Sequence, residues 1–295
     1  MFRRFLVAEW HATAGNSRPP RVGFFPNTAF TLMELLVVVA IIGTMAAMLL
    51  PALVVAKQQA ARIECISNEK QMLVAWTIYS GDYNDQLVLN GGDLATTSAQ
   101  PHLWVYGGNH GSADSLTNDL YLTGPAYSLF AYTKDQPAEQ IYKCPGDAST
   151  WPVWNATNAA MVTELRSYAL NSYIAPAYPT NPIIIDPAYN TYFKSSQIIA
   201  DSPVDRFVFM DVNPASICTP GFGVDMTLAK WIHYPSGLHR LRGVLVFADG
   251  HAEAHRWVDG QTTAPPGGST YIPHDNAGRG NPDLAWIAAR TSSLK

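Results

Sequence analysis

The sequence has few charged residues and few cysteines, and both shortages narrow the range of functions. Asp, Glu, Lys and Arg make up 14% of the 295 residues. No basic patch with interleaved aromatic residues is present, so nothing in the sequence supports nucleic-acid binding. The sequence contains three cysteines, Cys65, Cys144 and Cys218, whose spacing fits no zinc-site template. A Gly-rich phosphate loop, a nucleophile elbow and a Cys–His signature are also absent. We therefore expect a protein that is not an enzyme and uses no cofactor.

Apolar and turn-forming residues dominate what is present. Residues of the apolar classes make up 47% of the chain, which also has 21 Gly, 21 Pro, 14 Tyr and 8 Trp. This usage is typical of an extracytoplasmic, loop-rich body that contains β-structure. The length allows one sizeable domain or two small ones. Charge is uneven, because the stretch 1–29 holds four arginines against Glu9 as its one acid.

One long apolar run lies near the N-terminus. Residues 30–50 read FTLMELLVVVAIIGTMAAMLL, which as a helix is long enough to cross a bilayer at about 1.5 Å per residue. A cleaved secretory signal has a shorter run with its small-residue site after it, whereas here Ala29 precedes the run. The sequence therefore predicts a transmembrane helix.

The helix is expected to continue beyond the membrane as an amphipathic segment over 51–82. Pro51 ends the apolar run and is expected to kink or loosen the helix. Helix formers follow, and apolar residues recur at helical spacing from Ile66 to Tyr79. Gly81 is a natural stop, followed by a turn-like segment.

One acid lies inside the apolar run. Burying the carboxylate of Glu34 in lipid is costly, so an intramembrane acid is a functional hypothesis by default. The alternative is an ordinary membrane anchor with a stray acid. The segment Ala29-Phe30-Thr31-Leu32-Met33-Glu34-Leu35-Leu36 resembles the class III signal of type IV prepilins and type II secretion pseudopilins, in which a small residue precedes Phe-Thr-Leu-x-Glu-Leu-Leu and an unbroken apolar helix. That small residue is usually Gly and is Ala29 here.

The resemblance implies how the N-terminus is processed and used. A prepilin peptidase/methyltransferase would cut off the leader 1–29 between Ala29 and Phe30 and methylate the new Phe30 amine. Glu34 would pair with the N-terminal amine of a neighbouring subunit, and a buried carboxylate becomes tolerable when it meets an ammonium. The implied partners are other pilin or pseudopilin subunits and an inner-membrane assembly platform. The implied location is the bacterial inner membrane, with the N-terminus cytoplasmic, the body periplasmic, and extrusion in a fibre as a further outcome.

A second resemblance lies in the body. His239 is followed by nine residues and then Asp249-Gly250, which is similar to the His-x9-Asp-Gly signature of a large subgroup of long prepilin-like proteins. Members of that subgroup often carry an acidic, His-containing stretch after the Phe-x-Phe strand. This chain departs from the pattern there, because its segment 211–218 reads DVNPASIC and contains no histidine. Further similarity lies in Arg62-Ile63-Glu64-Cys65-Ile66-Ser67-Asn68, Tyr142-Lys143-Cys144-Pro145-Gly146-Asp147 and Arg166-Ser167-Tyr168-Ala169-Leu170-Asn171.

The preferences of the residues themselves also explain the Asp249-Gly250 turn. Residues 243–248 and 251–258 predict the two strands of a hairpin, and Asp249-Gly250 is the preferred two-residue turn between them. His239 is expected to cap or brace that turn, a structural role, with a catalytic role as the alternative. A Cys65–Cys144 disulfide is one option in an oxidising compartment, and it would staple the helix to the body.

Two groups of polar residues are weighed as metal ligands and set aside, so we expect no metal. His251, Glu253 and His255 alternate along one strand and share a face. A solvated polar face is the simpler interpretation, and a tethered metal enzyme is the less favoured alternative. Asp82, Asn84 and Asp85 offer oxygens suited to calcium but lack the full calcium-hand pattern, so an Asx turn is the simpler interpretation.

Aromatic residues support one alternative function. Trp104, Tyr106, Trp151, Trp154 and Trp231 suit a glycan or partner surface, although such residues more often pack in cores or loops. The sequence thus predicts an α+β fold, in which a long N-terminal helix packs on the antiparallel sheet of a pilin-like body, 83–260, enlarged by loops. A loosely ordered Gly/Pro-rich tail, 261–295, follows. The expected function is that of a structural pilin or pseudopilin subunit, and the alternative is a minor pilin that acts as an adhesin.

Overall fold

The computed structural model describes residues 31–90, 103–105, 117–123, 132–133, 138–154, 159–177, 185–265 and 271–295. The chain divides into two compact units, Met1–Pro51 and Ala52–Lys295. The first unit contributes the N-terminal part of a long helix. The second unit contains the rest of that helix and all the strands.

Helix α1 extends over Leu32–Asp82 and continues without interruption through Pro51. It covers the segments that the sequence predicts as a transmembrane helix and an amphipathic helix. It contains a stretch of mean hydropathy 2.5 and is long and apolar enough to cross a membrane. The structure therefore contains a candidate membrane span near the N-terminus.

Helix α1 ends at Asp82, one residue after Gly81, in a turn that makes the long hydrogen bond of a Schellman motif. Asn84 has a φ of 53°, and the N–H of Asp85 donates to the carbonyl of Ser80 at 2.8 Å. This 6→1 bond across a left-handed residue is the usual way to satisfy the last carbonyls of a helix. The turn thus uses Asn84, because asparagine tolerates the left-handed conformation better than most residues that carry a side chain.

A five-stranded sheet forms the centre of the second unit, in the order β5-β3-β4-β8-β9. Its strands are β3 (Tyr168–Asn171), β4 (Phe207–Asp211), β5 (Gly221–Phe222), β8 (Arg242–Phe247) and β9 (Ala252–Arg256). All neighbouring pairs are antiparallel except β3 with β5, which is parallel. The α+β expectation is confirmed, but the sheet is mixed rather than purely antiparallel.

Alternation along the strands gives the sheet two apolar faces. Val244 and Val246 of β8 belong to a core cluster that includes Met72 and Trp76 of α1. Leu245 and Phe247 belong to a second cluster, with Trp231 and Ile287. A bulge after Phe207 in β4 puts both Val208 and Phe209 into the first cluster. The second half of α1 therefore packs on one face of the sheet.

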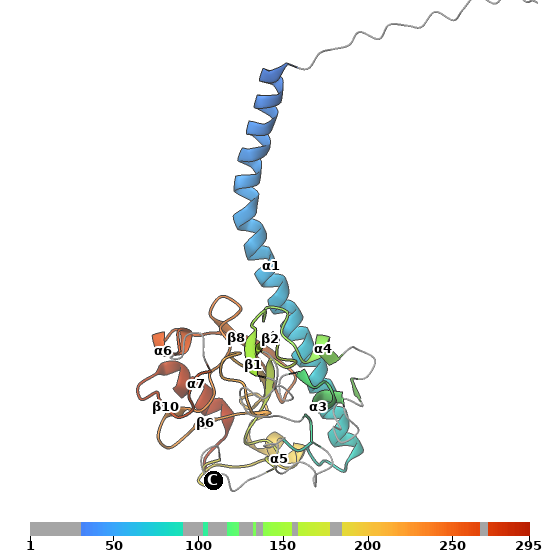
Figure 1. Cartoon of the computed structure of the whole chain (residues 1–295). Coiled ribbons are helices and arrows are strands. Elements are labelled where there is room, and N and C mark those ends of the chain that lie inside the picture. The colour runs from blue at the N-terminus through green and yellow to red at the C-terminus, as the bar shows by residue number, and fades with distance from the viewer. Residues whose placement is uncertain are drawn as a thin grey trace, which may run out of the picture. The chain divides into compact units, whose positions relative to one another are not determined.

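The opposite face of the sheet is covered by the C-terminal part of the chain. It carries the small sheet β10-β7-β6 (Asn276–Ala277, Lys230–Trp231, Val224–Asp225) and helix α7 (Pro282–Thr291). In Figure 1, α6 (Gly260–Thr263), α7 and β10 gather on one side of this unit. Helix α7 begins with Asn281 as its cap and Pro282 at its first turn, and it buries Leu284 and Ile287. The prediction of a loosely ordered tail is therefore wrong for the described residues of 261–295.

The other elements are short. They are α3 (Leu120–Thr123), α4 (Ala138–Ile141), α5 (Ser195–Asp201) and the hairpin of β1 (Trp151–Trp154) with β2 (Ala159–Val162). In Figure 1, α3 and α4 lie beside the C-terminal half of α1.

The predicted hairpin is present, but its loop is longer than expected. Phe247 donates its N–H to the carbonyl of His251 and accepts the N–H of Gly250, each at 2.9 Å. The loop is therefore Ala248-Asp249-Gly250, and Gly250 occupies the left-handed position with a φ of 96°. Three-residue loops with glycine there are the second common hairpin type. The Asp-Gly pair indicates the hairpin correctly but does not fix the loop length.

Candidate functional site

The N-terminus of α1 carries the residues on which the sequence prediction rests. Ala29 and Phe30 lie outside the described residues. Glu34 lies in the first turn, and its carboxylate accepts the N–H of Thr31 at 2.9 Å and the hydroxyl of Thr31 at 2.8 Å. The Thr31 hydroxyl in turn accepts the N–H of Glu34 at 3.2 Å. These reciprocal bonds form a capping box, so Glu34 has a local structural role at the start of the helix.

The helix that follows Glu34 exposes its apolar side chains. The large hydrophobic residues from Leu32 to Val54 have exposed fractions between 46% and 81%. Exposed hydrophobic surface of this extent needs a lipid or protein environment. The helix thus fits a membrane span or a signal anchor.

A buried polar cluster lies where α1 meets the sheet. Its members come from four segments: Cys65 from α1, Cys144 from the turn after α4, Asp211 from the end of β4, and His239 from the turn before β8. All four are at most 2% exposed. One side-chain ligand atom from each lies within 4.8 Å of the others. We call these four residues the Cys/Asp/His cluster.

Contacts within the cluster join the helix, the turns and the sheet. Cys144 Sγ lies 3.3 Å from His239 Nε2, Asp211 Oδ2 lies 3.6 Å from the same nitrogen, and Cys65 Sγ lies 4.0 Å from Asp211 Oδ2. The other oxygen of Asp211 accepts the N–H of Val244 at 2.8 Å, which fixes the carboxylate against β8.

The cluster shifts the acidity of its own groups. The hydrogen bond from the Cys65 thiol, together with one from His239, lowers the pKa of Cys144 to about 5, although burial opposes this change. Burial is the largest cause that raises the pKa of Cys65, and the bond to Cys144 raises it further. Burial and the charge of Cys144 raise the pKa of Asp211.

Glu69 adds a second buried acid beside the cluster. It follows Cys65 by one helical turn and is fully buried. Neither of its carboxylate oxygens has a hydrogen-bond partner of normal geometry among the residues that the structure describes. Burial, then Asp211 and Cys144, raise its pKa, and the backbone N–H of Asp211 acts in the opposite direction.

His239 does not brace the signature hairpin turn. It contacts Asp211 and Cys144, and Asp211 bonds to Val244 near the start of β8. The turn at Asp249-Gly250 follows the other end of β8, about 10 Å away at 3.3 Å per residue. The prediction that His239 braces the turn is therefore wrong. The side chain instead lies in the interior, in contact with Cys144 and Asp211.

The two cysteines considered for a disulfide are brought together, as free thiols. Cys65 and Cys144 are both fully buried and belong to the Cys/Asp/His cluster. The disulfide stays a prediction. Sequence reasoning missed Asp211 as their neighbour. The available signal was an acid at the end of the apolar strand FVFMD, all of whose residues are buried.

The first weighed metal group is not assembled. His251 Nδ1 lies 2.6 Å from Asp249, and His255 Nδ1 lies 3.0 Å from Glu253. The ring of His255 stacks on Trp286 at 3.6 Å between centroids. Within the part of the chain that the structure describes, these residues form no group of converging ligand atoms.

The second weighed metal group serves the fold. Asp82 accepts the hydroxyl of Tyr132 at 2.8 Å. Asp85 accepts the N–H of Ser196 at 3.1 Å and its hydroxyl at 2.5 Å, at the start of α5. Asn84 lies in the turn that ends the helix, so Asp82, Asn84 and Asp85 each have a different structural role. Among the residues described, these three form no group of converging ligand atoms.

A second group with ligand geometry lies elsewhere in the body. Cys218 Sγ lies 3.4 Å from Nε2 of both His233 and His274. His233 Nδ1 accepts the N–H of Gly223 at 3.0 Å, so in neutral imidazole the proton is on Nε2. Cys218 is partly exposed and His274 is exposed.

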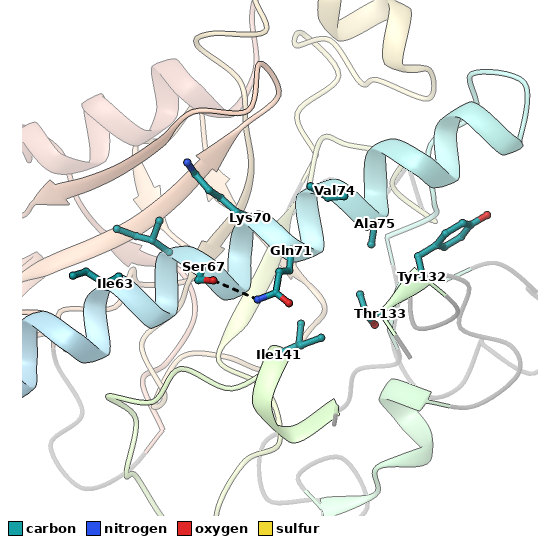
Figure 2. A pocket seen from close by; sticks show the side chains of 10 residues that line it. Ile63, Ser67, Lys70, Gln71, Val74, Ala75, Tyr132, Thr133 and Ile141 are labelled. Carbon is teal, nitrogen blue, oxygen red and sulfur yellow. Dashed lines mark hydrogen bonds between the residues drawn. The ribbon is translucent and has the colours of Figure 1, made fainter. Parts of the chain in front are cut away.

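A hollow of about 530 Å³ lies along α1 near Tyr132 and Ile141. Figure 2 shows Lys70 pointing away from the segment that carries Tyr132 and Thr133, and Gln71 bonded to Ser67 at 3.4 Å. Its described lining is mostly apolar. The full lining comprises Ile63, Ile66, Ser67, Lys70, Gln71, Val74, Ala75, Tyr132, Thr133 and Ile141.

Three of the aromatic residues considered for a binding surface are in the core. Trp104 and Trp231 are completely buried, and Trp151 is 7% exposed. Tyr106 and the side chain of Trp154 lie outside what the structure describes. For the three described tryptophans, core packing is confirmed, which weakens the case for an adhesive surface.

No protein-family model, curated protein or solved structure matches the chain. Its functional interpretation therefore depends on its own residues and their geometry.

Proposed function

We propose that the protein is a pilin or pseudopilin subunit that is stored in the inner membrane, loses residues 1–29, and polymerises through its N-terminal helix. The observation that carries the proposal is the position of Glu34. It is an acid in the first turn of a helix whose large hydrophobic side chains are exposed as far as Val54. An ionised carboxylate inside an apolar membrane helix is costly, up to about 2.5–3.5 kcal/mol at the bilayer centre, so a partner in the assembled state explains its presence.

The proposed partner of Glu34 is the N-terminal ammonium of a neighbouring subunit. After cleavage at Ala29, the methylated amine of Phe30 lies one residue before Thr31, next to the turn that holds Glu34. Prepilin peptidase/methyltransferase would create this amine, and an inner-membrane assembly platform would drive polymerisation. The body, Ala52–Lys295, would then lie on the periplasmic side.

The structure also offers a competing explanation for Glu34, because the carboxylate already caps the helix. A glutamine can replace glutamate in a capping box without loss of its bonds, but it cannot pair with an ammonium as an ion. The variants Glu34→Gln and Glu34→Ala therefore separate the two roles.

The test measures processing and assembly in the native host. In wild type we expect a mature chain that starts at N-methyl-Phe30, seen by intact mass and N-terminal sequencing of membrane protein. We expect both Glu34 variants to be processed and both to fail to enter fibres. A mature chain that still starts at Met1 contradicts the proposal. Fibre assembly by Glu34→Gln at the wild-type level would show that Glu34 acts as a cap alone.

A further inference from the structure

The geometry of the Cys/Asp/His cluster matches a tetrahedral metal site. In a zinc site with thiolate, imidazole and carboxylate ligands, bonds of about 2.0–2.3 Å place neighbouring ligand atoms about 3.4–3.8 Å apart. The corresponding separations are 3.3 Å between Cys144 and His239, 3.6 Å between His239 and Asp211, and 4.0 Å between Cys65 and Asp211. All four ligand atoms lie within 4.8 Å of one another, so small side-chain movements would bring them around one ion.

The contacts of the His239 imidazole do not fit a catalytic triad. In a nucleophile–base–acid arrangement, the histidine turns one nitrogen to the nucleophile and the other to the acid. Here the thiol of Cys144 and the carboxylate of Asp211 both face Nε2 of His239. Cys144 is also completely buried, so a substrate has no access to it. Convergence on one nitrogen is what shared ligation of an ion requires.

The Cys/Asp/His cluster buries several acidic groups, and a cation would offset their negative charge. Two thiols and the carboxylates of Asp211 and Glu69 are buried together, and among the described residues His239 is the one basic side chain in ion-pair contact with Asp211. Within the described part of the chain, both oxygens of Glu69 are without a hydrogen-bond partner of normal geometry. Buried carboxylates without a countercharge are costly, and a divalent ion would offset this cost.

We propose that Cys65, Cys144, Asp211 and His239 bind one zinc ion that fastens the second half of α1 to the sheet. Thiolates and an imidazole favour zinc over calcium or magnesium, which prefer oxygen ligands. Four protein ligands leave no open position, so the site is structural rather than catalytic. Glu69 lies beside the site, one helical turn after Cys65. This inference does not depend on the proposed assembly function.

The second group is a poorer metal site and serves as an internal control. Cys218, His233 and His274 provide three ligand atoms rather than four. Because Gly223 donates to Nδ1 of His233, the Nε2 that faces Cys218 carries the proton and cannot ligate an ion in that tautomer.

The experiment measures zinc in the full-length chain, purified in detergent without chelator. We expect one zinc ion per chain by elemental analysis, and thiolate-to-metal absorption bands after exchange with Co²⁺. Asp211→Asn keeps an acceptor for Val244 and nearly the same shape, so it separates loss of a ligand from loss of the fold. We expect Asp211→Asn and His239→Gln to weaken zinc affinity by at least about 10-fold. The matched controls Cys218→Ala and His274→Gln should keep zinc at the wild-type level.

Three results would overturn the proposal. One is a chain without zinc whose mass is lower by two hydrogen atoms and whose Cys65 and Cys144 peptides are cross-linked, which would establish the disulfide instead. Another is a folded chain with reduced thiols that takes up neither Zn²⁺ nor Co²⁺. The third is zinc that is lost from the Cys218→Ala control but kept by Asp211→Asn, which would place the ion at the second group.

Discussion

At the scale of the residue, Asn171 shows how a single buried side chain connects distant segments. Its amide donates to the carbonyls of Phe207 at 3.0 Å and Thr291 at 2.8 Å, and its oxygen accepts the N–H of Tyr173 at 3.0 Å. The side chain is completely buried, so water cannot replace these bonds. Asn171 therefore joins β3, β4 and the end of α7.

We predict that Asn171→Ala lowers the free energy of unfolding by about 3 kcal/mol, because three buried backbone groups lose their partner. Asn171→Asp should destabilise at least as much despite its similar shape, since it turns a carboxylate oxygen towards two carbonyls. Denaturant unfolding of the full-length chain in detergent, followed by tryptophan fluorescence, measures both. An aspartate variant as stable as wild type would contradict this account.

At the scale of the element, the ion pair of Asp201 and Arg206 ties α5 to the start of β4 and to α7. Arg206 Nε lies 2.6 Å from the Asp201 carboxylate, and its Nη1 donates to the carbonyl of Ala289 at 2.7 Å. The hydroxyl of Tyr192 also donates to Asp201 at 2.6 Å. Burial alone would raise the pKa of Asp201, but the bonds from Arg206 and Tyr192 outweigh it, and the pKa is lowered.

A lowered pKa in the folded state makes this contribution sensitive to acid. The stabilisation of the folded state by the ionised Asp201 carboxylate is fully present above the unfolded pKa of about 3.9. It is lost as the pH falls through the lower pKa of the folded state. We predict that Asp201→Asn is less stable than wild type by about 1 kcal/mol at pH 7. The difference should shrink below about pH 4. The stability difference between wild type and Asp201→Asn is measured from the unfolding midpoints of both proteins at pH 7 and below about pH 4. A difference that does not change with pH would show that the charge of Asp201 does not contribute to stability.

The same scale shows what the sequence could and could not predict. Strands β4 and β8 were predictable because burial dictates their apolar runs, and the long helix was predictable because its apolar run has the length of a membrane span. Helix α7 was missed although Asn281-Pro282 is a recognisable start, since Gly and Pro nearby suggested a tail. The loop length at Asp249-Gly250 was wrong because glycine suits two hairpin types.

The Cys/Asp/His cluster was beyond sequence reasoning for a different reason. Cys144 and His239 lie in two recognised motifs, yet no spacing rule links residues 95 positions apart. Their meeting depends on how β4 pairs with β8 and on where α1 crosses the sheet. Only the tertiary structure brings Asp211, at the end of β4, to the same point.

At the scale of the whole molecule, the chain combines an exposed apolar helix with a compact body. The large hydrophobic residues from Leu32 to Leu50 are exposed, whereas the second unit contains two well-buried core clusters. The two units therefore need different environments, and the partition of the chain between membrane and water should depend on the first unit alone.

We predict that the full-length chain stays in the membrane pellet after alkaline carbonate extraction. Two arginines in the middle of the span, Val39→Arg with Ile42→Arg, should release it or prevent insertion, because each costs about 2.5–3.5 kcal/mol in the bilayer core. The matched control Leu53→Arg with Val54→Arg adds the same charge to exposed positions of the same helix. These positions follow the apolar run, where long side chains reach the interface at little cost. Equal release of both variants, or extraction of the wild type, would mean that residues 30–50 do not anchor the chain.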